Sequence, residues 1–385
     1  MEEHAPDRIQ LKNHLSMELA YTEVVNYALQ QNKLPVIQKL TLFNEGEDAI
    51  EELTMEISST NDALLPCRKV IDFLPAGGAL DVENIQILFD ENKLIEFSEK
   101  ISSTLSFKFS KEENDFGEAA FPLTYLAYDQ WHGLHYYPEL LTAFILPNSS
   151  YASRIVLSAS EYLQKWTNNP SFDGYQQEDE TRVRYEAAAI YEAIQALSVV
   201  YAEPPASFEI TGQRIRLCDE VVDKRLGTCM DMTLLYASCL EAVGLNPILI
   251  VKRNHIFAGV WLDKNTFPNA VSDDPSIISK RFAEGVREIS VVECTQMNAG
   301  IHVPFDAAEV SAKKHFDKPD EILYVIDVRQ ARVCGIRPIP SRIKTDDGWR
   351  VDLQKSNEEP QEIVAPEEVE QVEITVEDEN NAAPK

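Results

Sequence analysis

The spacing of the apolar residues changes near Tyr128-Asp-Gln-Trp131, where helical runs first appear, and this change constrains the fold more than any other feature. Before it, apolar and polar residues alternate, which is typical of strands with one buried face. After it, apolar residues recur every three or four positions, which indicates helices. A chain of 385 residues is long enough for roughly two or three domains. We therefore expect an all-β domain followed by an α+β domain.

Residues 10–128 consist of short strand-like runs with turn signals between them. Between residues 15 and 29, seven of the eight odd positions are apolar, and most even positions are small or polar. Such alternation predicts a half-buried strand. Further runs of this kind are VIQKLTLF, AIEELTMEIS, KVIDFL, VENIQILF and ISSTLSFKFS. Short strands at this spacing predict an antiparallel Ig-like β-sandwich over 10–128.

Residues 129–345 carry helical and strand-like patterns in separate blocks. Helices are expected at 138–146, 151–166, 179–202 and 229–243. Strand-like runs then follow, with the sequences NPILIVK, HIFAGVWL, ISVVECT and ILYVIDV. Helices followed by adjacent strands indicate an α+β fold and argue against alternating βαβ units.

Charge and cysteine usage exclude several classes of function. The net charge of −29 opposes direct binding of nucleic acid and adsorption to anionic membranes. No apolar run reaches the roughly 18–20 residues of a transmembrane helix, and the acidic N-terminus is unlike a secretory signal. The six cysteines form no C-x-x-C pair, so we expect reduced thiols in the cytoplasm. Residues 351–385 hold 11 acidic and 2 basic residues, and we expect 346–385 to be a disordered acidic tail.

One cysteine lies where a helix is expected to begin. In Arg225-Leu-Gly-Thr-Cys-Met-Asp231, Thr228 is a good N-cap and Asp231 completes a capping-box pattern. Cys229 therefore falls on the first turn, where unpaired N–H groups and the helix dipole favour the thiolate form. We expect Asp231 to be structural and Cys229 to be a nucleophile.

A thiolate nucleophile needs a base and a group that orients the base. His255 opens the run HIFAGVWL, and Glu293 lies in the run VVECT, which we expect to be a strand. A histidine on one strand beside a carboxylate on another can be held in one tautomer, as a catalytic triad requires. The candidate triad is Cys229, His255 and Glu293.

These motifs resemble the transglutaminase-like superfamily, which has a papain-like thiol fold. The resemblance covers 180–300 and rests on G-T-C-x-D at 227–231, N-H-x-F-x-G-V-W at 254–261 and V-E-C-T at 292–295. Residues 10–345 also resemble the N-terminal module of large bacterial proteins in which a β-sandwich and a transglutaminase-like domain precede a helicase. The runs that carry this wider resemblance are LAYDQWHGL, PELLTAFILPN, PPASFEITGQRIRL and RLGTCMDMTLLYASCLEAVGLNPILI. No Walker-type motif occurs in the chain, and Glu293 stands where transglutaminases more often have Asp.

The resemblance implies a cysteine peptidase or acyl-transferase without a cofactor that acts on a protein or peptide substrate. By analogy with the order of residues in papain-like enzymes, Gln213 would stabilise the oxyanion or bind substrate. The helicase-linked relatives suggest a helicase or nuclease partner protein and a role in bacterial defence. The alternative is a catalytically silent peptide-binding or docking module that works with a separate helicase.

The remaining cysteines and histidines have simpler interpretations. We expect Cys239 and Cys294 to be buried and inert, and His302 and His315 to face solvent. A metal site at Cys229 and His255 would need further ligands, and no other residue lies at the spacing of a zinc motif. We therefore expect no metal.

Overall fold

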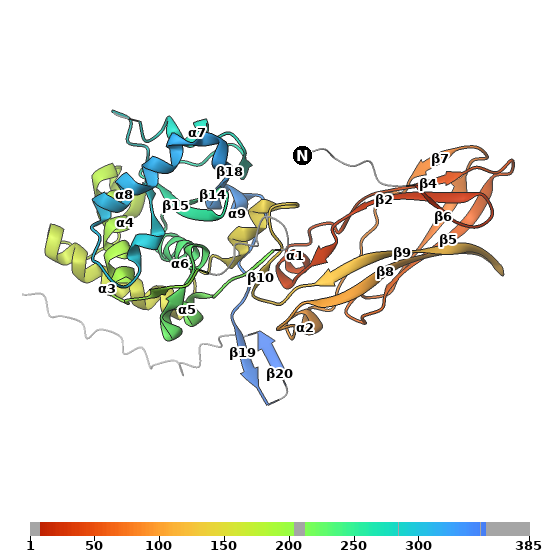
Figure 1. Ribbon diagram of the computed structural model, residues 1–385, viewed down its shortest axis with the longest axis horizontal. Coiled ribbons are helices and arrows are strands. Elements are labelled where there is room, and N and C mark those ends of the chain that lie inside the picture. The colour runs from red at the N-terminus through yellow and green to blue at the C-terminus, as the bar shows by residue number, and fades with distance from the viewer. Residues whose placement is uncertain (1–7, 204–211, 284, 347, 352–385) are drawn as a thin grey trace, which may run out of the picture. The chain divides into compact units, whose positions relative to one another are not determined.

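A computed structural model describes residues 8–203, 212–283, 285–346 and 348–351, and in these residues the chain is mixed α+β with several sheets. The N-terminal part is mostly strands, whereas most helices lie between residues 150 and 335 (Figure 1). The expected α+β class is confirmed at this level. Within the described residues, no helix is long and apolar enough to cross a lipid bilayer.

Two sheets make up most of the N-terminal part. Their strand orders are β1-β2-β4-β7 and β3-β9-β8-β5-β6, and every pairing except the parallel pair β3–β9 is antiparallel. The strands are β1 (Ile9–Gln10), β2 (Leu15–Tyr21), β3 (Val24–Val25), β4 (Ile37–Asn44), β5 (Ile50–Ser59), β6 (Cys67–Leu74), β7 (Ala79–Asp81), β8 (Ile101–Lys111) and β9 (Asn114–Tyr125). In β5, the alternating residues Leu53, Met55 and Ile57 are buried, as the period of two predicts.

Three details of this part differ from the prediction. The run at 15–29 is not one strand: β2 ends at Tyr21, and the short β3 follows. Asn26 then caps the helix α1 (Tyr27–Gln31) and accepts a hydrogen bond from the N–H of Leu29. The run VENIQILF is not a regular strand and holds only an isolated bridge between Leu64 and Phe89. Strand β9 was not expected, and it pairs with β8 along most of its length.

A third sheet, entirely antiparallel, has the strand order β16-β18-β14-β15-β17. Its strands are β14 (Pro247–Lys252), β15 (His255–Trp261), β16 (Val271–Ser272), β17 (Ile289–Val292) and β18 (Ile322–Asp327). Both faces of β14 are covered, since Leu249 and Val251 join one apolar cluster and Ile248 and Ile250 join another. The four expected runs therefore all supply strands of one sheet.

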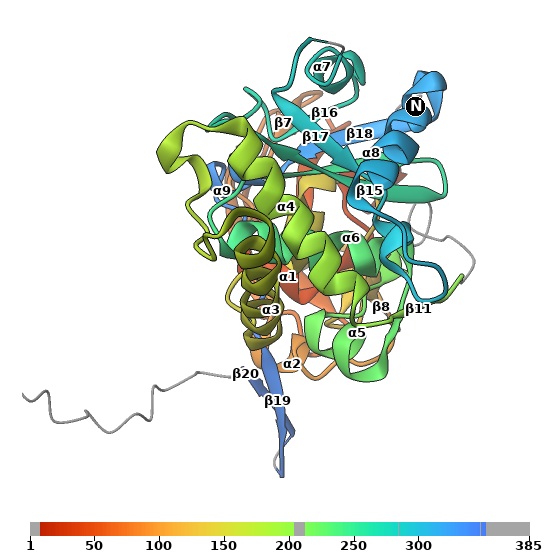
Figure 2. The same cartoon turned by 90° about the vertical axis from the view of Figure 1, so that its left-hand side faces the viewer.

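Helix α6 (Cys229–Ala242) packs against β14 and β15 and is buried along almost its whole length. Helices α3 (Ser150–Thr167) and α4 (Glu180–Gln195) pack against each other and against α6 (Figure 2). The predicted helix at 179–202 ends early, because the chain turns at Ser198, whose φ is 55°, and continues as a strand.

The remaining elements are short. The strands are β10 (Gln130–Trp131), β11 (Val200–Tyr201), β12 (Gln213–Arg214), β13 (Leu226–Gly227), β19 (Arg342–Thr345) and β20 (Gly348–Val351). The α-helices are α2 (Glu91–Leu94), α5 (Cys218–Lys224), α7 (Ser276–Ser279), α8 (Phe305–Lys314) and α9 (Val328–Val333). The 3₁₀-helices are η1 (Pro138–Phe144), η2 (Gly174–Gln177), η3 (Cys294–Met297), η4 (His315–Asp317) and η5 (Pro319–Glu321), so the helix expected at 138–146 is of the 3₁₀ type.

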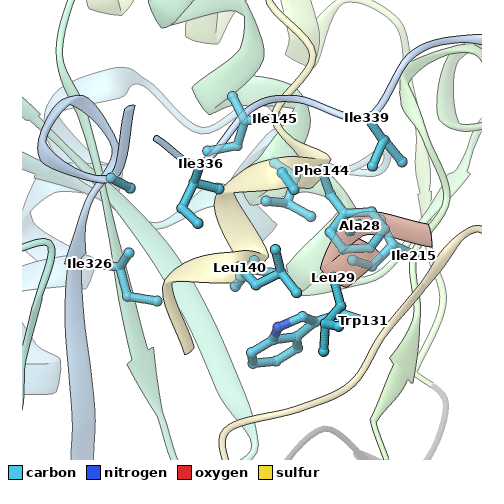
Figure 3. Packing of buried hydrophobic residues seen from close by; sticks show 14 of the residues in the cluster. Ala28, Leu29, Trp131, Leu140, Phe144, Ile145, Ile215, Ile326, Ile336 and Ile339 are labelled. Atoms are coloured by element: carbon cyan, nitrogen blue, oxygen red, sulfur yellow. The ribbon is translucent and has the colours of Figure 1, made fainter. Parts of the chain in front are cut away.

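Segments from the two predicted domains share one apolar cluster (Figure 3). Leu29 of α1, Trp131 of β10, Phe144 of η1 and Ile339 are all buried in it. The side chain of Asn26 also donates to the carbonyl oxygen of Gln130 at 2.8 Å. Residues as far as Val351 belong to one compact unit, and the division at 128/129 stays a prediction. Strand β20 falls within the predicted tail, whereas 352–385 lie outside the described residues.

Candidate active site

The nucleophile candidate occupies the first position of α6. Thr228 is the N-cap: its side chain accepts from the N–H of Asp231 at 3.2 Å, and its own N–H donates to Asp231 Oδ2 at 2.9 Å. The Asp231 carboxylate also forms an ion pair with Arg216, with 3.1 Å between Nη1 and Oδ2. The predicted capping box is therefore present, and its hydrogen bonds hold Cys229 on the first turn of the helix.

Cys229 and His255 meet where α6 crosses the start of β15. The imidazole of His255 lies close enough to the sulfur of Cys229 for the thiol to raise the pKa of the ring. The buried Thr233 hydroxyl lies 2.7 Å from the carbonyl oxygen of Cys229 and 3.2 Å from that of Ile256, so it joins the two elements beside this pair. Cys229 itself is only 7% exposed, which limits access to the thiol.

Glu293 is hydrogen-bonded to His255. Nε2 of His255 lies 2.8 Å from Oε2 of Glu293. The prediction that Glu293 lies on a strand is wrong, because β17 ends at Val292 and Glu293 is the N-cap of η3. Its Oε1 accepts from both the N–H and the hydroxyl of Thr295, at 3.0 and 2.6 Å. The capping turn leaves the other carboxylate oxygen available to the histidine.

The electrostatics of the pair favour charge separation. Burial lowers the pKa of His255, but its interactions with Cys229 and Glu293 more than compensate and raise it to about 9. Burial raises the pKa of Glu293, but the hydrogen bonds from its histidine neighbours outweigh burial and hold it well below its usual range. Near neutral pH, the site therefore holds an imidazolium beside a carboxylate.

A second histidine shares this carboxylate, which sequence reasoning missed. Nε2 of His315, the first residue of η4, lies 2.7 Å from Oε2 of Glu293. Its ring lies 5.1 Å from that of His255 and 4.8 Å from that of Phe257. The expectation that His315 faces solvent is therefore wrong: the side chain is 25% exposed and bonded into the site. No motif surrounds it, so only the packing of η4 against β15 reveals it.

Tyr201 is a second residue that the sequence did not single out. Strand β11 runs parallel to β13, with Tyr201 opposite Gly227, two residues before the nucleophile. The side chain of Tyr201 lies close enough to Cys229 for the two groups to interact electrostatically. Burial and the neighbouring Cys229 raise the pKa of Tyr201 to about 12, so its hydroxyl is neutral and can donate.

The remaining predicted residues lie in different surroundings. Gln213 is buried on β12 opposite Trp131, and its side-chain oxygen has no hydrogen-bond partner within the described part of the chain; its role at the oxyanion stays a prediction. Cys239 and Cys294 are buried, as expected, and burial raises the pKa of both thiols. His302 is exposed and bonds to Glu192 at 2.9 Å.

His255, Glu293 and His315 bring three possible metal-ligating atoms within 4.8 Å of one another. A metal on Nε2 of His315 would place the ring proton on Nδ1. That atom lies 3.3 Å from the ammonium of Lys252, which is itself only a donor. The Nδ1–H group of His315 and the ammonium of Lys252 would then be two donors facing each other, next to the positive charge of the metal. This arrangement therefore does not suit a metal ion.

Comparisons with known proteins give no further assignment. No protein-family model matches the chain, and a search of curated proteins found no similar sequence.

Proposed function

We propose that this protein is a transglutaminase-like cysteine peptidase or acyl-transferase that cleaves or transfers an amide or isopeptide bond. The single observation that carries the proposal is that the imidazole of His255 is hydrogen-bonded to Glu293 and interacts with the thiol of Cys229. A thiol at a helix N-terminus, a base beside it and a carboxylate that orients the base are the three parts that thiol catalysis requires.

The reaction proceeds through a thioester. The Cys229 thiolate attacks the carbonyl carbon of the substrate, and a C–S bond forms. The imidazolium of His255 gives its proton to the departing amine as the C–N bond breaks. Water or a second amine then attacks the thioester and yields its proton to His255, and the C–S bond breaks to regenerate the thiolate. We favour hydrolysis, because water is the most abundant acceptor and bacterial members of the superfamily that the sequence resembles more often look like proteases.

The negative oxygen that forms during both attacks needs hydrogen-bond donors. The backbone N–H of Cys229 is one candidate, since the first N–H groups of a helix have no partner within the helix. The neutral hydroxyl of Tyr201 is the second, because it already contacts the sulfur that the carbonyl carbon must approach. Gln213 remains the third candidate.

The fold supports the same assignment. The nucleophile lies on a buried helix, the base opens a central strand, and the acid follows the neighbouring antiparallel strand, as in the transglutaminase-like arrangement. The two sheets of the N-terminal part are consistent with an Ig-like β-sandwich over 10–128 that precedes a thiol domain over 129–345. A helicase or nuclease partner in bacterial defence follows from the sequence resemblance alone.

The test uses casein and a biotinylated primary amine as substrates in ¹⁸O-labelled water. Hydrolysis predicts peptide fragments with labelled carboxylates, and acyl transfer predicts biotin on glutamine side chains or at new C-termini. C229A should abolish either product, whereas C334S, which removes an exposed cysteine, should leave it unchanged.

A second measurement separates catalysis from a silent docking module. Iodoacetamide at pH 6 with peptide mapping should label Cys229 faster than Cys67 or Cys334, despite its burial, because only Cys229 has a histidine partner. Faster labelling of Cys67 or Cys334 contradicts the nucleophile. Reactive Cys229 without either product from any substrate supports the docking module.

A further inference from the structure

Two histidines compete for one carboxylate oxygen in this site. Oε2 of Glu293 lies 2.8 Å from Nε2 of His255 and 2.7 Å from Nε2 of His315. A single carboxylate carries one negative charge, and two imidazolium rings with centroids 5.1 Å apart would repel each other. Protonation of one ring therefore disfavours protonation of the other.

Lys252, which lies on the side of the His315 ring away from Glu293, decides which of the two histidine rings is protonated. Lys252, the last residue of β14, places Nζ 3.3 Å from Nδ1 of His315. An ammonium is only a donor, so Nδ1 must accept and the ring proton must lie on Nε2, where it donates to Glu293. A proton added at Nδ1 would break this bond and place a second cation beside the ammonium.

The ammonium is itself held in place. Lys252 Nζ lies 2.9 Å from Oε2 of Glu321, and its side chain is only 13% exposed. Glu321 also accepts from the exposed Lys318, at 3.2 Å. The His315 ring is thus hydrogen-bonded to the Glu293 carboxylate on one side and to the Lys252 ammonium on the other, and the His255 ring lies 5.1 Å away.

We propose that Lys252 and His315 are positioning residues. Lys252 keeps His315 neutral, so the negative charge of Glu293 stabilises only the imidazolium of His255. This inference rests on the proposed function, because it assigns the two residues to support of the His255 base. They act through Glu293 and need not touch a substrate.

The proposal gives an effect of unexpected sign. Lys252 is paired directly with His255 across β14 and β15, so loss of its positive charge alone should favour protonation of His255. If Lys252 instead keeps His315 neutral, then its loss lets His315 take a proton, and His255 becomes harder to protonate. Direct electrostatics and the proposal therefore predict opposite shifts.

The experiment is a pH titration of the full chain with ¹³C-labelled histidine rings, with the His255 signal assigned from H255Q. We expect K252M to lower the titration midpoint of His255 by about one pH unit. The matched control K318M removes a neighbouring lysine that also pairs with Glu321 but does not contact His315, and it should leave the midpoint unchanged. The double variant K252M/H315Q should restore the midpoint, because glutamine can still donate to Glu293 but cannot take a proton.

An unchanged or raised midpoint in folded K252M overturns the proposal, as does a midpoint that the double variant fails to restore. If K252M does not fold, then ¹⁵N shifts of His315 in the unaltered protein decide: the neutral Nε2–H form near pH 7 supports the proposal, and any other form contradicts it. None of these measurements needs a substrate. Absence of amide products with the expected titrations would therefore refute the proposed function while leaving the charge assignment intact.

Discussion

The hydroxyl of Thr233 on α6 lies 3.2 Å from the carbonyl oxygen of Ile256 on β15. The same hydroxyl lies 2.7 Å from the carbonyl oxygen of Cys229. One buried side chain thus joins the turn that carries the nucleophile to the strand that carries the base. The relative placement of Cys229 and His255 depends on this contact as well as on the packing of α6 against β15.

T233V tests this contact, because valine keeps the shape of the side chain and removes the hydroxyl. We expect a loss of about 1 kcal/mol in the free energy of unfolding, measured with urea. Alkylation of Cys229 at pH 6 should slow by roughly threefold or more, as the thiol and imidazole lose their alignment. The control S158A removes an exposed hydroxyl on α3 that donates to the carbonyl oxygen of Arg154, and it should change neither quantity. Normal Cys229 reactivity in T233V would show that packing alone positions the pair.

E293Q tests the carboxylate. The side chain accepts four hydrogen bonds, two from Thr295 and one from each of His255 and His315, whereas glutamine offers one acceptor oxygen and an NH₂ donor. We expect at least ~10-fold lower activity and a lower melting temperature, because some of these donors must face another donor.

The order of damage to activity should be C229A, then H255A, then E293Q. C229A should change the melting temperature least. A folded E293Q fraction with full activity would reduce the triad to a Cys229–His255 dyad.

Stability should fall as the pH rises from neutral to alkaline. Folding raises the pKa of His255 from 6.5 to about 9, so the folded chain binds the proton more tightly. This contribution is complete below pH 6.5 and is lost as the pH rises through about 9. Folding lowers the pKa of Glu293 below its ordinary value of 4.5, so this residue stabilises the folded chain above pH 4.5. That stabilisation is lost as the pH falls into the acid range. The two residues together therefore stabilise most between about pH 4.5 and 6.5.

Urea unfolding at pH 6 and pH 9 measures this dependence. The difference in unfolding free energy between the unaltered chain and H255Q should shrink at pH 9. The control is S158A, which removes an exposed hydroxyl that does not titrate and should give the same difference at both pH values. A constant difference for H255Q would contradict the charged pair.

Y201F removes the hydroxyl that interacts with Cys229. The sulfur loses a neighbouring donor, so alkylation of Cys229 at pH 6 should slow by roughly threefold or more. Turnover of a substrate should also fall, by up to ~100-fold if the hydroxyl also stabilises the oxyanion. The control Y185F alters an exposed tyrosine on α4 and should have no effect. An unchanged alkylation rate would show that Tyr201 does not act on the thiol.

Local patterns in the sequence were sufficient for much of the fold. Alternation in β5 and the apolar runs NPILIVK and HIFAGVWL of β14 and β15 predicted strands, because the period of the side chains along a strand decides which of them are buried. The capping box at Thr228 and Asp231 predicted where α6 begins, since its hydrogen bonds lie within one turn. The candidate triad followed from these elements together with the family resemblance.

The sequence by itself thus determined the helix that presents Cys229, the strand that begins with His255 and the apolar run that leads to Glu293, although it placed Glu293 within the strand. Only the tertiary structure placed Glu293 on a capping turn and brought Tyr201, His315 and Lys252 around the site. The reason is physical. Caps and periodicity arise from hydrogen bonds and burial among residues close in the chain, whereas the sharing of one carboxylate by two histidines depends on how η4 packs against β15, which no local pattern encodes.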